Sequence, residues 1–438
     1  MNKTMNITEQ ISKRILEIQR KEFSEEIWDQ ARACLLDYIG VCTAGAKLLQ
    51  VQNEEILSRN LDNCKKCTII GTENKVDPYT AILINGWNGH AMELDDGHRF
   101  GMIHLATVIC PPLLALFEND MFSKKQLLRG IIAGYEVAVG LAIAMQPSHK
   151  QRGYHTTGTC GTIGAAAAIA TAMDYKEKEI KTTLSAAATS AGGLLEIQED
   201  GSDLKAFNAG QTALNGYIAG QLGKSGWKGP EDILGGPRGM LRVMSDWSGQ
   251  NIDWSNHFYI ETIYRKPYAS CRHSHSAIEA AIFLKKTYKF FLKEIKNIEV
   301  QTYKAAILGH NHKQICGVSS AKMSTPYSVA VALMFGKAGI AEFSNENIEN
   351  SDLIKLMSLI EIVENEDLTK AAPKKRAAIV TVHLKNGKSY MKQVDFPKGE
   401  PENPMSKEEL EIKFSELCSF AEINKNKVSN IKEQIWML

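Results

Sequence analysis

The sequence predicts a mainly α protein, with an all-helical domain built from both chain ends and an α+β domain inserted into it. Through the first half of the chain, apolar residues recur at helical spacing and long Ala- and Gly-rich runs appear. Beyond Lys266, alternating segments and a hairpin signal take over, and a helical pattern returns after the Pro- and Gly-rich residues 397–404. We therefore expect residues 1–264 and 400–438 to form the helical domain and residues 265–399 the α+β domain.

The helices of the first part are predicted from periodicity and from small side chains. Ser24 suits the start of a helix, because the two glutamates that follow it place acids in the first turn. Ala and Gly allow close helix approach, so their abundance favours a tightly packed bundle. The expected helices cover residues 9–20, 24–44, 78–92, 133–144, 161–173, 183–193 and 209–222.

The inserted part combines strands and helices. Residues 297–303 alternate as a strand does, and Asn386-Gly387 between residues 378–385 and 388–396 predicts a hairpin with a type I′ turn. Ser406 and Glu409 match a capping box that opens a last helix. Further helices are expected at residues 276–286, 326–335 and 351–360.

Composition is that of an ordinary soluble globular protein, with 44% hydrophobic and 23% charged residues among 438 and a net charge of +1. This charge favours neither nucleic acid nor a membrane as partner. The chain has no uncharged apolar stretch of about 18 residues and no apolar core of signal-peptide length near its start, so we expect no membrane span.

Cysteine usage indicates reduced thiols and a cytoplasmic protein, because several of the nine cysteines lie in apolar helical runs. Cys64 and Cys67 form the one CxxC pair. A zinc or iron–sulfur site needs more thiolate or imidazole ligands at suitable spacing, so we expect no metal.

Residues 85–116 hold the densest set of ionisable groups. Six of them fall within the twelve residues from 93 to 104, directly before an apolar run. Unpaired charges are costly to bury, so the segment is either a solvated loop or a functional site. The six groups are Glu93, Asp95, Asp96, His98, Arg99 and His104.

Two Gly-rich loops in the first half add cations. Arg152 and His155 precede an Ala-rich helix, whose free N–H groups suit an anion, although such a loop alone is more often a turn. Lys205 lies between two apolar helices, where a surface lysine is the plain alternative, and Asn208 is the expected N-cap of the next helix.

Two further clusters lie in the inserted part. Lys266, Arg272 and His275 belong to a basic loop before Ser276, which we expect to open a capping box; a solvated loop is the alternative. Thr325 as N-cap would place Tyr327 in the first turn of an apolar helix, where a tyrosine is more often part of the core.

These groups together suit proton transfer on a small carboxylate. Lysine and arginine hold carboxylates, while histidine, carboxylate and tyrosine side chains move protons. Removing a proton alpha to a carboxylate creates a dianion that nearby cations must stabilise. Dehydration and epimerisation can both begin in this way, and the same cations can serve loss of CO₂.

Six segments of the chain resemble the MmgE/PrpD family. They occur in family order: NGHAMELDDGHR at 88–99, RGYHTTGTCGTIGAAAA at 152–168, DGSDLKAFNAG at 200–210, KPYASCRHSHSAIEA at 266–280, MSTPYSVA at 323–330 and PKGEPENPMS at 397–406. Activities in this family include dehydration of 2-methylcitrate, decarboxylation of cis-aconitate and epimerisation of iminodisuccinate.

The resemblance implies a helical domain with an α+β lid, a cleft between them and a homodimer, without an iron–sulfur cluster. It also implies which residues form the active site. These are Glu93, His104, His155, Lys205, Lys266 and Tyr327, with Arg272 and His275 adjacent.

Five positions depart from the family pattern. Glu93 replaces a frequent Asp, Gly97 a Thr and Leu105 a Pro. Cys271 and Asn208 stand where histidines are seen in some members, and the first of these histidines is one that the decarboxylase uses. These changes argue against cis-aconitate decarboxylation and leave the exact carboxylate open.

We therefore expect a cofactor-independent hydro-lyase acting on a small di- or tricarboxylate such as 2-methylcitrate, as in propionate metabolism. The same-class alternative is an epimerase of an iminodisuccinate-like diacid, and the other is a non-catalytic carboxylate-binding homologue. His104 and His155 are the acid/base candidates, Glu93 or Asp96 orients one of them, and Tyr327 protonates a leaving group. The expected carboxylate-binding groups are Lys205, Lys266 and Arg272, with Arg152, His98, Arg99 and His275 adding positive charge.

Overall fold

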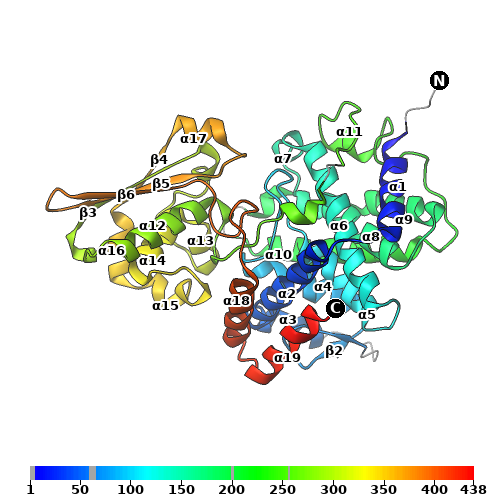
Figure 1. The fold of residues 1–438 in the computed structure, drawn as a ribbon, viewed down its shortest axis with the longest axis horizontal. Helices are drawn as coiled ribbons and strands as arrows, with labels where there is room; N and C mark the ends of the chain where they lie inside the picture. Colours follow the sequence, from blue (N-terminus) through cyan, green and yellow to red (C-terminus); the bar gives the residue numbers. More distant parts are fainter. Residues whose placement is uncertain (1–4, 59–65, 199–201, 255–256) are drawn as a thin grey trace. The chain divides into compact units, whose positions relative to one another are not determined.

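The computed structural model describes residues 5–58, 66–198, 202–254 and 257–438, and the fold is mainly α (Figure 1). The chain divides into a helical unit, Met1–Tyr264 with Ser406–Leu438, and an α+β unit, Arg265–Met405. The α+β unit ends at Met405, whereas the sequence suggested that it ends at Gly399. The reason is that Gly399 and Glu400 are bonded within the α+β unit, to the backbone N–H of Arg265 and to the side chain of Arg272.

The helical unit contains long helices and a short two-stranded ribbon. The ribbon pairs β1 (Cys67–Thr68) with β2 (Lys75–Val76) in antiparallel fashion. The helices are α1 (Ile7–Arg20), α2 (Glu25–Leu48), α3 (Gln50–Ser58), α4 (Pro78–Ala91), α5 (Ala106–Phe117), α6 (Lys124–Met145), α7 (Ser148–Gln151), α8 (Thr156–Ala172), α9 (Glu177–Ser190), α10 (Leu204–Leu222), α11 (Met240–Met244), α18 (Lys407–Phe420) and α19 (Lys425–Trp436).

Small residues set the spacing of the central helices. A Cβ atom at Gly164 of α8 would lie 2.6 Å from the Cβ of Ala138 and 2.8 Å from the carbonyl oxygen of Gly134, both on α6. A Cβ at Gly86 of α4 would lie 2.6 Å from the Cα of Gly210 on α10. The tight bundle predicted from the Ala- and Gly-rich runs therefore depends on backbone-to-backbone approach.

Helix α6 is long and apolar enough to cross a membrane by length and composition, and so is the bent pair of α2 and α3. Most of the α6 side chains are buried inside the helical unit. A buried core helix can have the same length and composition, and the burial of α6 is that of a central helix of the bundle.

The C-terminal helix α18 returns to pack on α2. Its Phe414 and Leu417 are buried, and a Cβ at Gly40 of α2 would lie 2.9 Å from Phe414 Cδ2. The capping box predicted at its start is confirmed: the Ser406 hydroxyl accepts from Glu409 N, and the Glu409 carboxylate accepts from Ser406 N.

The α+β unit is built on a four-stranded sheet in the order β4-β3-β5-β6, where β3 pairs parallel with β4 and antiparallel with β5. Helix α12 packs on β5 and β6, and α14 packs on α12 (Figure 1). The strands are β3 (Ile295–Thr302), β4 (Ile360–Glu364), β5 (Ala378–Leu384) and β6 (Ser389–Val394); the helices are α12 (His275–Thr287), α13 (Val318–Met323), α14 (Thr325–Phe335), α15 (Asn345–Ile348), α16 (Ser351–Ser358) and α17 (Glu366–Ala371).

The predicted β5–β6 hairpin is confirmed, but the prediction of a type I′ turn is wrong. Leu384 N donates to Lys388 O at 2.8 Å, which closes a three-residue loop. Among the loop residues only Gly387 has a positive φ, 86°, whereas a type I′ turn needs Asn386 there as well. A left-handed glycine after a tight turn therefore makes the connection.

Three predicted helix starts are displaced. Helix α10 is capped by Asp203, so Asn208 lies inside it and is not its N-cap. Helix α12 is preceded by Ser274, so the capping box at Ser276 is wrong. Ser324, one residue before the expected Thr325, caps α14 by accepting from Tyr327 N at 3.2 Å.

Candidate active site

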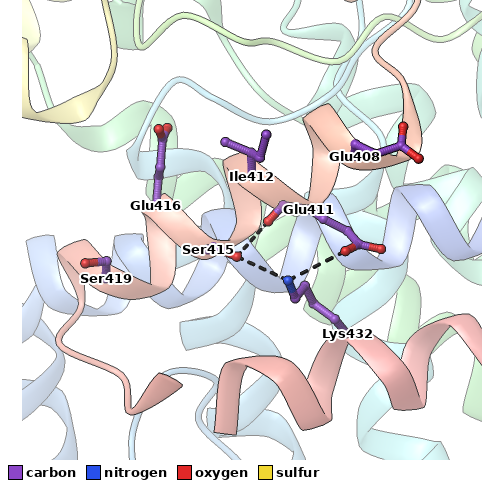
Figure 2. Close-up of a pocket in the computed structure, with 7 residues that line it drawn as sticks. All are labelled: Glu408, Glu411, Ile412, Ser415, Glu416, Ser419 and Lys432. Carbon is purple, nitrogen blue, oxygen red and sulfur yellow. Dashed lines mark hydrogen bonds and ion pairs between the residues drawn. The ribbon is translucent and has the colours of Figure 1, made fainter. Parts of the chain in front are cut away.

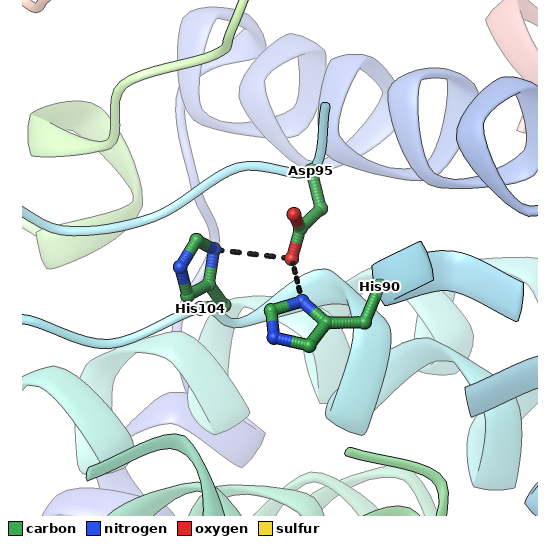
Figure 3. A group of neighbouring side chains, drawn as sticks. All are labelled: His90, Asp95 and His104. Atoms are coloured by element: carbon green, nitrogen blue, oxygen red, sulfur yellow. Dashed lines mark hydrogen bonds and ion pairs between the residues drawn. The ribbon is translucent and has the colours of Figure 1, made fainter. Parts of the chain in front are cut away.

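One carboxylate oxygen holds two imidazoles in the helical unit (Figure 3). His90 lies in the last turn of α4, and Asp95 and His104 lie in the segment between α4 and α5. Asp95 Oδ2 is 2.7 Å from His90 Nδ1 and 3.0 Å from His104 Nδ1. The two rings meet edge to face, with centroids 4.8 Å apart.

The proton position on His104 follows from its partners. His104 Nδ1 also lies 2.8 Å from the backbone carbonyl oxygen of Asp96, which can only accept a hydrogen bond. Nδ1 therefore carries the proton, and Nε2 of the neutral ring keeps its lone pair. The His104 side chain is 15% exposed, whereas those of Asp95 and His90 are 1% and 0% exposed. His104 is thus the member of the trio that can meet a substrate.

Burial and charge act against each other in this trio. Burial alone would raise the pKa of Asp95, but the two imidazoles outweigh it and hold that pKa well below its usual value. Burial lowers the pKa of His90, although Asp95 opposes the change. Asp95 is therefore ionised at neutral pH, and it stabilises a positive charge that forms on His104.

The same three side chains meet the geometric conditions for a metal site, since their ligand atoms lie within 4.8 Å of one another. Both imidazoles, however, approach Asp95 at hydrogen-bond distances, and His104 Nδ1 also donates to Asp96 O. A metal ligand needs a free lone pair at that nitrogen. With Nδ1 of both rings donating to Asp95, neither of these nitrogens offers a lone pair to a metal in this arrangement.

Asp96 anchors the segment and acts on His104 through its backbone. Its Oδ1 accepts from Ala106 N at 3.0 Å at the start of α5, and its Oδ2 accepts from the Tyr135 hydroxyl at 2.5 Å. Burial raises the pKa of Asp96 to about 6, against the effect of the Tyr135 hydrogen bond. The Asp96 side chain is thus hydrogen-bonded within the fold, and the Asp96 backbone carbonyl orients His104.

His155 forms a second, separate pair with Asn208. His155 precedes α8, and its Nδ1 lies 2.7 Å from Asn208 Oδ1 on α10, while Asn208 Nδ2 donates to Gly192 O at 3.4 Å. The amide oxygen accepts, so His155 Nδ1 carries the proton. Burial, with smaller contributions from the charges of His90, Lys205 and His104, lowers the pKa of His155 to about 3. His155 is therefore neutral at neutral pH.

Lys205 and Glu93 form a short ion pair at the same site. Lys205 comes from the first turn of α10, and the two side chains are 15% and 12% exposed. Glu93 adopts a left-handed φ of 55°, a conformation that costs a non-glycine residue about 1 kcal/mol or more. The pair places a cation beside the imidazoles at a cost in backbone strain.

Three other predicted residues of the helical unit have different surroundings. His98 is buried, and its Nδ1 accepts from Gly101 N at 3.0 Å. Arg99 lies over the ring of Phe100, 5.0 Å from its centroid. Arg152 donates to Asp246 Oδ1 at 2.6 Å, so its guanidinium is directed to a surface partner rather than to the histidines.

Two of the predicted residues of the α+β unit, Arg272 and His275, belong to a buried network. Arg272 donates from Nη2 to Glu400 Oε1 at 2.7 Å, and its Nη1 lies 2.7 Å from His275 Nδ1. His275 Nε2 lies 3.1 Å from Ser270 O, so Nε2 carries the proton and Nδ1 accepts from Arg272. Lys266 is also buried, at 1% exposure.

Tyr327 places a buried hydroxyl in the α+β unit. Its side chain is 1% exposed, and among the described residues its Oη has no hydrogen-bond partner. Burial raises the pKa of Tyr327 to about 12, so the hydroxyl keeps its proton at neutral pH. A buried, protonated hydroxyl of this kind can donate to a ligand.

The cysteine predictions are only partly covered by the structure. Cys64 lies outside the described residues, and so do residues 199–201 of the predicted Lys205 loop. Cys67 is buried, and its Sγ accepts from Asn119 Nδ2 at 3.3 Å. Cys271, which stands where the resemblance expects a histidine, lies 3.8 Å from His310 Nε2 and so keeps an imidazole beside it.

A surface pocket of about 420 Å³ lies apart from the histidines, between α18 and α19 (Figure 2). Its lining carries acidic and hydroxyl side chains, and Lys432 reaches Ser415 Oγ at 3.4 Å and Glu411 Oε2 at 3.6 Å. None of the residues that line it is an imidazole, so this pocket lacks the groups for proton transfer.

Sequence reasoning missed His90 and the bridging role of Asp95. His90 lies within a segment read as helix, and Asp95 was one acid among several. The available signal was the spacing: a histidine in the last turn of a helix, followed five residues later by an acid, can fold back onto that acid.

Comparison with known proteins covers nearly the whole chain. Residues 9–253 match the MmgE/PrpD N-terminal domain, and residues 268–437 match the MmgE/PrpD C-terminal domain. A cis-aconitate decarboxylase-like protein, oryM, of Aspergillus oryzae is 23% identical over 99% of this chain and 94% of its own length. The cis-aconitate decarboxylases of Aspergillus terreus and Homo sapiens are 23% and 22% identical, over 100% and 93% of this chain and 94% and 87% of their own lengths.

Proposed function

Because the chain belongs to the MmgE/PrpD family, we propose that it is a cofactor-independent lyase that removes a proton alpha to a carboxylate of a small di- or tricarboxylate. The reaction we assign first is the dehydration of a 2-methylcitrate-like substrate. The observation that carries the proposal is the bridging carboxylate of Asp95, which holds His104 Nδ1 and so supports His104 as the proton acceptor.

His104 is the base in this proposal. Its Nδ1 proton is held by Asp95 and by the Asp96 carbonyl, so Nε2 offers a lone pair in a fixed direction. When Nε2 takes the substrate proton, the imidazolium that forms lies beside an ionised carboxylate. That arrangement lowers the energy of the charged state that develops during the reaction.

His155 then serves as a neutral partner rather than as the resting acid. With a pKa of about 3 it holds no extra proton at neutral pH, so its Nε2 can accept a hydrogen bond but cannot protonate the leaving hydroxyl. The Cα–H electron pair forms the new double bond as the C–O bond breaks, the departing hydroxide takes a proton from Tyr327 to give water, and the proton gained by His104 returns to Tyr327 through solvent. This sequence needs no outside oxidant or reductant.

Lys205 supplies the positive charge that the carbanion requires. Its present partner is Glu93, and a substrate carboxylate is an equivalent partner for the ammonium group. For the α+β unit we keep the predicted roles of Lys266 in carboxylate binding and of Tyr327 in proton donation. The buried hydroxyl of Tyr327, without a hydrogen-bond partner among the described residues, supports the latter.

Decarboxylation of a cis-aconitate-like substrate is the second candidate, because the relatives named above carry that activity in their names. It would use the same cations, with CO₂ leaving its bonding electron pair on carbon and His104 delivering a proton to the carbanion that forms. Cys271 and Asn208 favour the first candidate, since each replaces a histidine seen in some members of the family.

The test is a panel of carboxylates incubated with the enzyme in D₂O and followed by proton NMR. The panel holds 2-methylcitrate, citrate, cis-aconitate and simple diacids. New alkene signals at constant carbon count support dehydration, whereas alkene signals with release of CO₂ would move the assignment to decarboxylation. Deuterium wash-in without an alkene would replace both with epimerisation, and saturable binding without any exchange would overturn the enzymatic proposal.

A further inference from the structure

A lysine from the far end of the chain contacts the segment that holds the proton-transfer groups. Lys413 on α18 donates to the carbonyl oxygen of Leu94 at 2.8 Å and to Asp37 Oδ1 on α2 at 2.6 Å. Leu94 lies between Glu93, the partner of Lys205, and Asp95, the partner of both imidazoles. We propose that Lys413 is a positioning residue for the His90–Asp95–His104 trio, an inference that rests on the proposed function of this site.

The geometry of the peptide bond explains how the contact acts. The carbonyl of Leu94 and the N–H and Cα of Asp95 share one rigid plane, so a group that fixes the Leu94 oxygen also fixes where the Asp95 side chain begins. Glu93, on the other side, has a left-handed φ of 55°, and the segment therefore needs support from outside. Lys413 gives that support through a charge-assisted hydrogen bond.

Burial makes the contact strong and specific. Lys413 and Asp37 are 7% and 4% exposed, so water competes little for the ammonium group. The ion pair with Asp37 keeps Lys413 in place and balances its charge. Helix α18 itself is held by Phe414 and Leu417 against α2, which lets Lys413 be changed without removing the helix from the core.

The opposite face of α18 offers a matched control. There Lys432 of α19 contacts Ser415 and Glu411 of α18, as Figure 2 shows, without contact to Leu94. Lys432→Met removes a lysine contact to the same helix and should leave kcat, KM and the pH profile as in the wild type.

The experiment compares four proteins: wild type, Lys413→Met, the double variant Asp37→Asn/Lys413→Met, and Lys432→Met. Lys413→Met should lower kcat by about 10- to 100-fold with little change in KM, because the base is misplaced while the binding groups remain. It should also lower the melting temperature, because Asp37 is left buried and unpaired. The double variant should regain the melting temperature but not kcat.

A readout that needs no turnover separates this inference from the proposed function. The ring signals of ¹³C-labelled His104 and His90, assigned through His104→Gln and His90→Gln, should shift in Lys413→Met and in the double variant and should not shift in Lys432→Met. Unchanged ring signals with wild-type kcat would overturn the positioning role, and so would recovery of kcat in the double variant. If no carboxylate is turned over by the wild type, the proposed function fails while the ring signals still decide the role of Lys413.

Discussion

Asp95 and His104 are joined by a 3.0 Å contact between a carboxylate oxygen and Nδ1 of the imidazole. The same oxygen lies 2.7 Å from His90 Nδ1, so one buried carboxylate orients two rings. Only His104 of the three is partly exposed, and its Nε2 is the nitrogen left for chemistry. This relationship supports the proposed role of His104 as the base and leads to the following predictions.

Asp95→Asn should lower kcat by about 100-fold, because the imidazolium loses its neighbouring charge and the amide can present a donor to His104 Nδ1. Steady-state kinetics on the substrate identified by NMR measure the change. Asp246→Asn is the control, since it removes a carboxylate that contacts only Arg152 among the predicted site residues. Equal activity in the two variants would contradict the role of Asp95.

Lys205→Met should lower kcat and raise KM, each by about tenfold or more, because both the charge that stabilises the carbanion and a charge-assisted contact to a substrate carboxylate are lost. Glu93→Gln removes the present partner of Lys205 but keeps the cation, so it should raise KM far less. Initial rates over a range of substrate concentrations give both values. If KM is the same in Lys205→Met and in the wild type, Lys205 does not bind the substrate.

Tyr327→Phe should reduce kcat by about tenfold or more while leaving the free energy of unfolding almost unchanged. The reason is that the hydroxyl has no hydrogen-bond partner among the described residues, so its removal breaks no bond described in the fold. The control is Tyr303→Phe, which loses a 2.6 Å hydrogen bond to His273 and should cost about 1 kcal/mol of stability. A stable Tyr327→Phe variant with full kcat would assign Tyr327 to the core.

The depressed pKa of His155 predicts how stability changes with pH. Its ordinary value is 6.5 and its value in the fold is about 3, so between these pH values the unfolded chain binds a proton that the native protein does not. The contribution of His155 to stability is therefore complete above pH 6.5 and falls by up to about 1.4 kcal/mol per pH unit as the pH drops.

The measurement is denaturant unfolding of the wild type and of His155→Gln at several pH values. Asp96, with its pKa raised to about 6, changes stability in the opposite sense below that pH, but it is present in both proteins and cancels in their difference. The free energy of unfolding of the wild type minus that of His155→Gln should decrease as the pH falls. A difference that is independent of pH would contradict the buried, neutral state of His155.

Periodicity and small residues predicted the helical character, and the clusters of charge indicated several segments that the structure brings together. Glu93, Lys205, His104 and His155 do carry mutual contacts or electrostatic effects in one unit. The pairing within the set could not be predicted, since it depends on where helices end. Asn208 shows why: because α10 begins at Leu204, the side chain lies inside the helix and reaches His155.

Contacts between distant segments were also beyond the sequence. Arg152 and Arg272 were equivalent cations in the sequence, yet their partners are Asp246 and Glu400, acids 94 and 128 residues away. The contact of Lys413 with Leu94 could not be predicted from the sequence, because only the packing of α18 on α2 brings the two residues together. Such roles follow from tertiary packing rather than from local pattern.

The central claim is that His104 removes the substrate proton, and hydrogen–deuterium exchange at the substrate's alpha carbon tests it most directly. Proton NMR in D₂O follows this exchange for the wild type and for His104→Gln, with binding confirmed by saturable shifts of the substrate signals. We predict that His104→Gln binds the substrate and loses exchange and turnover by about 100-fold or more. Exchange within a few-fold of the wild-type rate in His104→Gln would contradict the account.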